Sequence, residues 1–234
     1  VAGKLREVSR VKGCPVGASV TACPDPSRAI DERLAELVVG MRHYEEAGID
    51  FLELNESCPN TPDDAGGFDE LRARLGYLEE HFLARRQRVL PVVVKFSCDT
   101  EPTQVPVLLD LLIALRFDGV NFGNTSTDYA LHRQLIAKGE TRLFDTFTTR
   151  FGGGLSGRPL ARPSLRLCEV ALRHLRQHPP EHEFHVIRTG GIENAADVAA
   201  SETAGVSFNQ WYTGYFEAFA RVGHGLYREL YRQL

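Results

Sequence analysis

The sequence contains no apolar run long enough to cross a bilayer, and its first residues lack the organisation of a signal peptide. No block of like charge is present, and the formal net charge of −4 gives no indication of nucleic-acid binding. The five cysteines are odd in number, irregularly spaced and without a CxxC pair, which argues against a disulfide framework and a zinc site. We therefore expect a cytoplasmic protein with reduced thiols, no metal and no membrane segment.

Methionine and lysine are scarce. The chain begins at Val1 and holds one methionine, Met41, so we expect it to be part of something longer. The chain has only four lysines but 23 arginines. One of them, Lys95, ends an apolar, strand-like run. This position indicates either a compact positive charge needed there, or an ammonium that reaches solvent from a strand end.

Short apolar runs rich in β-branched residues alternate with longer amphipathic stretches. Strands are expected at residues 15–20, 50–55, 91–96, 118–122, 184–188 and 205–209, and helices at 26–46, 68–88, 101–115, 164–177, 194–201 and 214–234. An irregular excursion over 124–159 is too long for a plain connection and indicates a functional loop. Strands that are apolar on both faces, each followed by a helix, predict one α/β domain over residues 1–234 with a helix-covered parallel sheet.

Two architectures fit six such units: an open doubly wound sheet, and a (β/α)8 barrel that lacks two units. No GxGxxG motif follows any expected strand, which weakens the doubly wound alternative. In both architectures the residues that follow the strands meet at the carboxyl edge of the sheet, where active sites of these folds assemble.

Glycine-containing turns follow the last two expected strands. Gly190-Gly191 would let the backbone approach an anion, and Tyr212-Thr213-Gly214 repeats the arrangement one unit later with an added hydroxyl. Barrels often hold phosphate in the loops after strands 7 and 8, so the first strand here would be strand 3. The pattern predicts a phosphate site, with tight turns as the simpler interpretation.

The stretch ELNESCPN, residues 53–60, ends the second expected strand in polar groups. A thiol in a polar loop can act as a general acid or base, so Cys58 is the sharpest candidate for proton transfer. Cys14 and Cys168 are interpreted as small buried hydrophobic residues.

Six motifs resemble the dihydroorotate dehydrogenases in the same order: ELNESCPN, PVVVKFS, DGVNFGNTST, FGGGLSGRPL, TGGI and WYTG. That family consists of FMN-dependent (β/α)8 barrels, and the similarity runs from about Pro15 to the end. The resemblance implies an incomplete barrel of six βα units that correspond to strands 3–8. No segment matches the first two units of the family, which carry flavin contacts and a lysine that grips the substrate carboxylate.

The resemblance also implies roles for individual residues. Cys58 is similar to the base that takes a proton from C5 of dihydroorotate, and Lys95 would lie near N1 of FMN and the pyrimidine C2 oxygen. The remaining implied contacts are Asn55, Asn60, Asn124 and Thr125 for the pyrimidine, with Asn55 also near the cofactor, and Ser156, Gly157, Gly190, Gly191, Tyr212 and Thr213 for the FMN ribityl phosphate.

The implied activity is oxidation of dihydroorotate to orotate in pyrimidine biosynthesis, with homodimer formation as a further expectation. The alternatives are a dihydropyrimidine dehydrogenase-like enzyme acting on uracil or thymine, and a non-catalytic flavin-binding remnant. Three departures from the family pattern stand out. Gly123 replaces a threonine, Arg188 is expected to add a phosphate contact, and Glu56 replaces an aliphatic residue.

Overall fold

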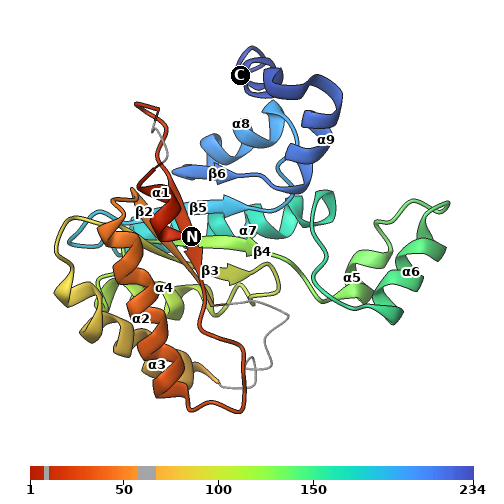
Figure 1. Cartoon of the computed structure of the whole chain (residues 1–234). Helices are drawn as coiled ribbons and strands as arrows, with labels where there is room; N and C mark the ends of the chain where they lie inside the picture. The colour runs from red at the N-terminus through yellow and green to blue at the C-terminus, as the bar shows by residue number, and fades with distance from the viewer. Residues whose placement is uncertain (8–10, 57–66) are drawn as a thin grey trace.

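The computed structural model describes residues 1–7, 11–56 and 67–234. Its strands are β1 (Gly17–Val20), β2 (Phe51–Asn55), β3 (Val92–Ser97), β4 (Gly119–Asn124), β5 (His185–Thr189) and β6 (Phe208–Gln210). All neighbouring pairs are parallel, and the order across the sheet is the order along the chain (Figure 1). A doubly wound sheet reverses its strand order at a switch point, whereas a barrel does not. The fold is therefore an incomplete α/β barrel, open between β1 and β6.

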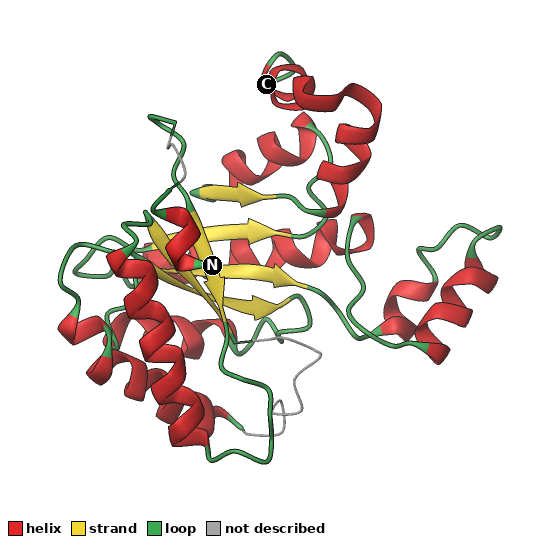
Figure 2. Ribbon diagram, in the orientation of Figure 1, coloured by secondary structure: helices red, strands yellow, loops and turns green. Residues whose placement is uncertain are grey.

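The principal helices are α2 (Ile30–Glu46), α3 (Phe68–His81), α4 (Val105–Ala114), α7 (Ala161–Gln177), α8 (Ala195–Ala204) and α9 (Thr213–Val222). Shorter helices are α1 (Ala2–Leu5), α5 (Tyr129–Arg133), α6 (Thr141–Arg150) and α10 (Leu226–Tyr231). Figure 2 shows each of the strands β1 to β6 followed by helix, as the alternating pattern in the sequence predicts. No helix in the described ranges is long and apolar enough to span a membrane.

Strand alternation separates an outer apolar face from an inner polar one. Leu52 and Leu54 of β2, and Val94 of β3, belong to the core that packs against the helices. The alternate positions, such as Glu53 and Lys95, point to the interior of the barrel. Burying the outer face supplies the main stabilisation, at roughly 25 cal/mol per Å² of apolar surface removed from water.

Three predicted segments differ in detail. The excursion over 124–159 contains helices α5 and α6, which project away from the sheet (Figure 1). The expected C-terminal helix is broken between α9 and α10 at Gly223, whose φ of +60° lies outside the helical region. The helix expected to reach residue 88 ends at His81, and a short 3-10 turn, Leu83–Arg85, follows it.

Candidate functional site

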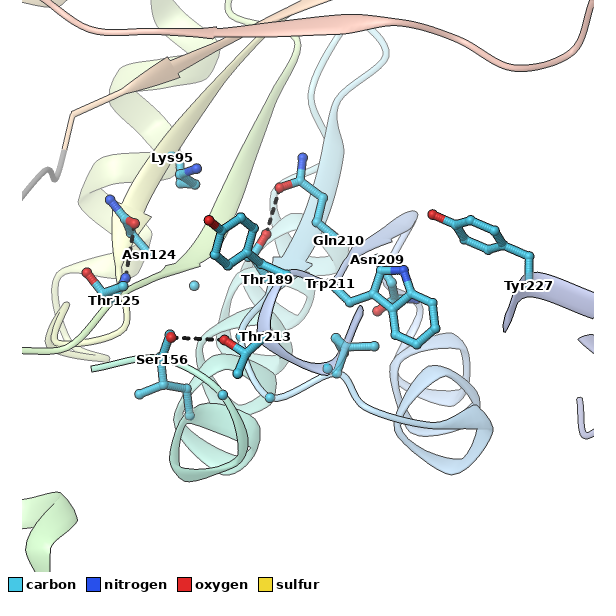
Figure 3. A pocket seen from close by; sticks show the side chains of 18 residues that line it. Lys95, Asn124, Thr125, Ser156, Thr189, Asn209, Gln210, Trp211, Thr213 and Tyr227 are labelled. Atoms are coloured by element: carbon cyan, nitrogen blue, oxygen red, sulfur yellow. Dashed lines mark hydrogen bonds between the residues drawn. The ribbon is translucent and has the colours of Figure 1, made fainter. Parts of the chain in front are cut away.

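An open pocket of about 610 Å³ lies at the carboxyl ends of the strands (Figure 3). Nine of the residues predicted to bind the cofactor or the pyrimidine line it: Lys95, Asn124, Thr125, Ser156, Gly157, Gly190, Gly191, Tyr212 and Thr213. The lining also includes residues that were not assigned a site role, among them Thr189, Asn209, Gln210, Trp211 and Tyr227. The fold thus brings residues more than a hundred positions apart in the chain to one cavity.

One end of the pocket is built from glycines and hydroxyls. Ser156 Oγ and Thr213 Oγ1 lie 2.9 Å apart and face each other in Figure 3. Gly191 has a φ of +71°, and a Cβ there would come within 2.3 Å of the Ala161 backbone. Thr213 opens helix α9, whose first N–H groups have no partner within the helix and favour negative charge. This end of the pocket suits an anion such as phosphate.

Lys95 reaches the pocket from β3, and its Nζ donates a 2.6 Å hydrogen bond to Glu53 Oε1. Glu53 is 3% exposed and lies in the middle of β2. Its oxygens also accept hydrogen bonds from Asn121 Nδ2 at 2.7 Å, Gln210 Nε2 at 2.9 Å and Ser19 Oγ at 3.2 Å. Burial of a charge costs free energy unless the charge is paired and hydrogen-bonded. The four donors, one of them cationic, offset this cost for the buried Glu53 carboxylate.

These contacts belong to one connected layer, which we call the polar ring. Thr189 completes it, because its Oγ1 donates to Asn121 Oδ1 and approaches Gln210 Oε1, both at 2.9 Å. Each strand from β1 to β6 contributes one member: Ser19, Glu53, Lys95, Asn121, Thr189 and Gln210. Sequence reasoning missed the role of Glu53, although an acidic residue between two leucines of a buried strand was a visible signal.

The polar ring has a consequence for stability in acid. Burial opposes ionisation of Glu53, but the charge and hydrogen bond of Lys95, with the bonds from Asn121 and Gln210, outweigh burial and lower its pKa below the ordinary 4.5. A lowered pKa in the folded state stabilises the protein above the unfolded pKa, and this stabilisation is lost as the pH falls through the folded value.

We therefore predict that Glu53→Gln makes stability less dependent on pH in acid. The free energy of unfolding of the wild type should fall more steeply than that of the variant between about pH 5 and pH 2. Urea unfolding at a series of pH values measures both slopes. Glu202→Gln, an exposed change on α8, serves as the matched control and should keep the wild-type slope. Equal slopes for wild type and Glu53→Gln would contradict the assignment.

The structure describes only some of the residues predicted to bind the pyrimidine. Asn55 does not line the pocket, but its Oδ1 accepts a 2.8 Å hydrogen bond from Asn124 Nδ2, which does. Asn124 Oδ1 in turn accepts from the Thr125 backbone N–H at 3.0 Å. Cys58 and Asn60 lie outside the described residues, so their roles stay predictions.

The expected phosphate contact of Arg188 is wrong. Its side chain is 1% exposed and points from β5 toward the helices, away from the pocket. There it donates to Ser164 Oγ at 3.0 Å, Ser201 Oγ at 2.7 Å, and the backbone oxygens of Asp197 and Ala161. Arg188 therefore ties β5 to α7 and α8 and has a structural role.

Glu56 and the buried thiols also have structural explanations. Glu56 pairs with Arg74 of α3 at 3.0 Å, which accounts for an acid at the end of β2. Burial raises the pKa of the Cys98 and Cys168 thiols to about 12, so both are protonated at neutral pH. Neither thiol is suited to act as a base. The expectation of a buried thiol is confirmed for Cys168 but wrong for Cys14, which is exposed in the segment before β1.

Comparisons with known proteins agree with the fold. The family model described as dihydroorotate dehydrogenase matches residues 16–234. The dihydroorotate dehydrogenase (quinone) of Idiomarina loihiensis is 31% identical over 212 residues, which are 88% of this chain and 56% of that protein. The Xylella fastidiosa (strain 9a5c) protein of the same name is 33% identical over 170 residues, 70% of this chain and 44% of its own length.

A comparison with solved structures supports the same fold. The crystal structure of DHODH from Eimeria tenella in complex with ferulenol superposes with a TM-score of 0.74 at 19% identity, over 99% of this chain and 61% of that one. The chain spans about half the length of the curated relatives it matches. Because the family model covers nearly the whole chain, the protein belongs to the dihydroorotate dehydrogenase family.

Proposed function

We propose that this chain supplies the FMN site and part of the pyrimidine site of an oxidoreductase that converts dihydroorotate to orotate. The observation that carries the proposal is the single pocket in which nine residues implied by the family motifs meet. The names of the curated relatives support dihydroorotate as the substrate, and the quinone in those names supports a quinone as the final oxidant.

The pocket fits FMN in size and chemistry. Its volume of about 610 Å³ falls in the range of 300–1,000 Å³ typical of cofactor pockets. Ser156, Thr213 and the glycine turns offer donors and close backbone approach to a phosphate.

When bound, FMN would supply the hydride acceptor that the amino acids of this chain lack. Lys95, which lines the pocket, would stabilise negative charge on the reduced cofactor. The amides of Asn55 and Asn124, which already bond each other, would orient the pyrimidine ring.

Cys58 is the proposed base. As a thiolate it would take the proton from C5 of dihydroorotate, while the hydrogen on C6 leaves as hydride with its bonding electrons. Loss of both hydrogens leaves the C5–C6 double bond of orotate, so the substrate is oxidised by two electrons and the acceptor is reduced by two. Holding the thiol against C5 is the step that this chain itself performs.

The proposal is tested first by the colour and cofactor content of the purified protein. We expect a yellow protein that releases FMN on denaturation and rebinds it in equimolar amount. A colourless protein that takes up no added FMN would exclude the flavin function.

A hydroxyl substitution tests the phosphate end of the pocket. Thr213→Val should weaken FMN binding by about tenfold or more, because a hydrogen bond to a charged group contributes roughly 1.5–3 kcal/mol. Riboflavin lacks the phosphate, so its affinity should change little. Thr203→Val, which removes an exposed hydroxyl bonded to the Ala199 oxygen on α8, is the matched control. Equal losses for FMN and riboflavin would place the phosphate elsewhere.

A further inference from the structure

We propose that Glu53 is the positioning residue for Lys95. Its carboxylate would hold the lysine ammonium in the pocket, beside the part of the cofactor on which negative charge develops. This inference rests on the proposed function, since it requires FMN in the pocket. Glu53 itself is not among the residues that line the cavity, whereas Lys95 is. The carboxylate therefore acts through the lysine and not by touching the ligand.

The ion pair is well shielded from solvent. Lys95 Nζ and Glu53 Oε1 are 2.6 Å apart, and the two side chains are only 14% and 4% exposed. Without the Glu53 carboxylate, the lysine would lose a charged partner and could turn toward water on its flexible stem. The ammonium would then leave its position in the pocket.

The carboxylate is itself fixed by the sheet. Asn121 of β4 and Gln210 of β6 donate to Oε2, while Ser19 of β1 and Lys95 of β3 donate to Oε1. Strands on both sides of β2 therefore set the orientation of Glu53. Rotation of the carboxylate would break several of these bonds at once, so the lysine is placed by the whole polar ring.

The ring has one positive and one negative member, and of these two only the positive one lines the pocket. Thr189 and Gln210, which also line the pocket, are uncharged. A ligand in the pocket would therefore meet the Lys95 ammonium, whereas the Glu53 carboxylate contacts the ammonium and not the ligand. This order favours the more negatively charged, reduced form of FMN over the oxidised form.

The test compares the affinities of reduced and oxidised FMN for the purified protein and its variants under anaerobic conditions. Glu53→Gln keeps the shape and one acceptor but removes the charge. We expect the preference for reduced FMN to fall by about tenfold or more, which lowers the potential of the bound two-electron couple by about 30 mV. An unchanged or increased preference would overturn the inference, because Lys95 would then keep its position without the carboxylate.

A second variant covers the case in which Glu53→Gln does not fold. Glu53→Asp keeps the charge but withdraws the carboxylate from Nζ by one methylene. We expect the preference for reduced FMN to fall in the same direction, and an unchanged preference in a folded Asp variant would overturn the inference. In a Lys95→Met background, Glu53→Gln should add nothing. A further change of the same size there would show that Glu53 does not act through Lys95.

Glu56→Gln is the matched control. It makes the same substitution in another well-buried ion pair, three residues further along the chain, at a residue bonded to Arg74 and outside the polar ring. This control should leave the preference unchanged, and an equal fall would overturn the inference. If the wild-type protein binds neither form of FMN, the proposed function fails. If it binds both forms, and Glu53→Gln leaves the ratio of their affinities unchanged, only this inference fails.

Discussion

Cys58→Ala should slow the reduction of bound FMN by dihydroorotate by about 10²-fold or more, which is the usual contribution of a general base. FMN binding should stay, because the proposed cofactor contacts come from other parts of the chain. Stopped-flow absorbance under anaerobic conditions measures the rate directly, and a titration with FMN checks that the site is intact. A wild-type rate in this variant would remove Cys58 from the mechanism.

Cys98→Ala provides the matched control. This thiol lies near the carboxyl edge of the sheet, but it is 6% exposed and its pKa is raised to about 12 by burial. It does not line the pocket of the proposed site. We expect a small loss of stability and a flavin reduction rate close to that of the wild type. A large rate loss here would mean that the effect of Cys58→Ala is not specific.

Gly123→Ala should destabilise the fold by about 3 kcal/mol or more. Gly123 has a φ of +138°, which L side chains rarely adopt, and a Cβ there would lie 1.5 Å from the Thr189 carbonyl oxygen. That oxygen is backbone, so β4 and β5 would have to move apart at the mouth of the pocket. Urea unfolding of the variant and the wild type measures the difference.

Gly76→Ala separates this effect from the general cost of replacing glycine. Gly76 lies within α3, and a Cβ there meets nothing within 4 Å. Alanine is favoured over glycine in a helix by roughly 1 kcal/mol, so this variant should be slightly more stable than the wild type. If Gly123→Ala were as stable as Gly76→Ala, the close approach of β4 and β5 would be contradicted.

The strand and helix pattern, and the positions where strands end, were readable from the sequence. Gly190-Gly191 and Thr213 follow neighbouring strands, so the parallel arrangement alone brings them to one edge. Ser156 is different, because the long excursion gives no register. Its place in the phosphate site was implied only by the family resemblance, and its hydrogen bond with Thr213 was not predicted.

The polar ring could not be predicted, because alternation shows which face a residue occupies but not which partners it meets across the barrel. Glu53 bonds Gln210, 157 positions away, and no local pattern links the two. Arg188 was misinterpreted for a simpler reason. It alternates with Thr189 along β5, so if Thr189 faces the interior, Arg188 faces the helices.

The most direct test of the central claim is anaerobic mixing of the FMN-loaded protein with dihydroorotate and, separately, with dihydrouracil, while the absorbance of oxidised flavin is followed. The account predicts that dihydroorotate bleaches the flavin and that dihydrouracil does not. Bleaching by dihydrouracil alone, or by neither compound in a protein that binds FMN, would contradict it.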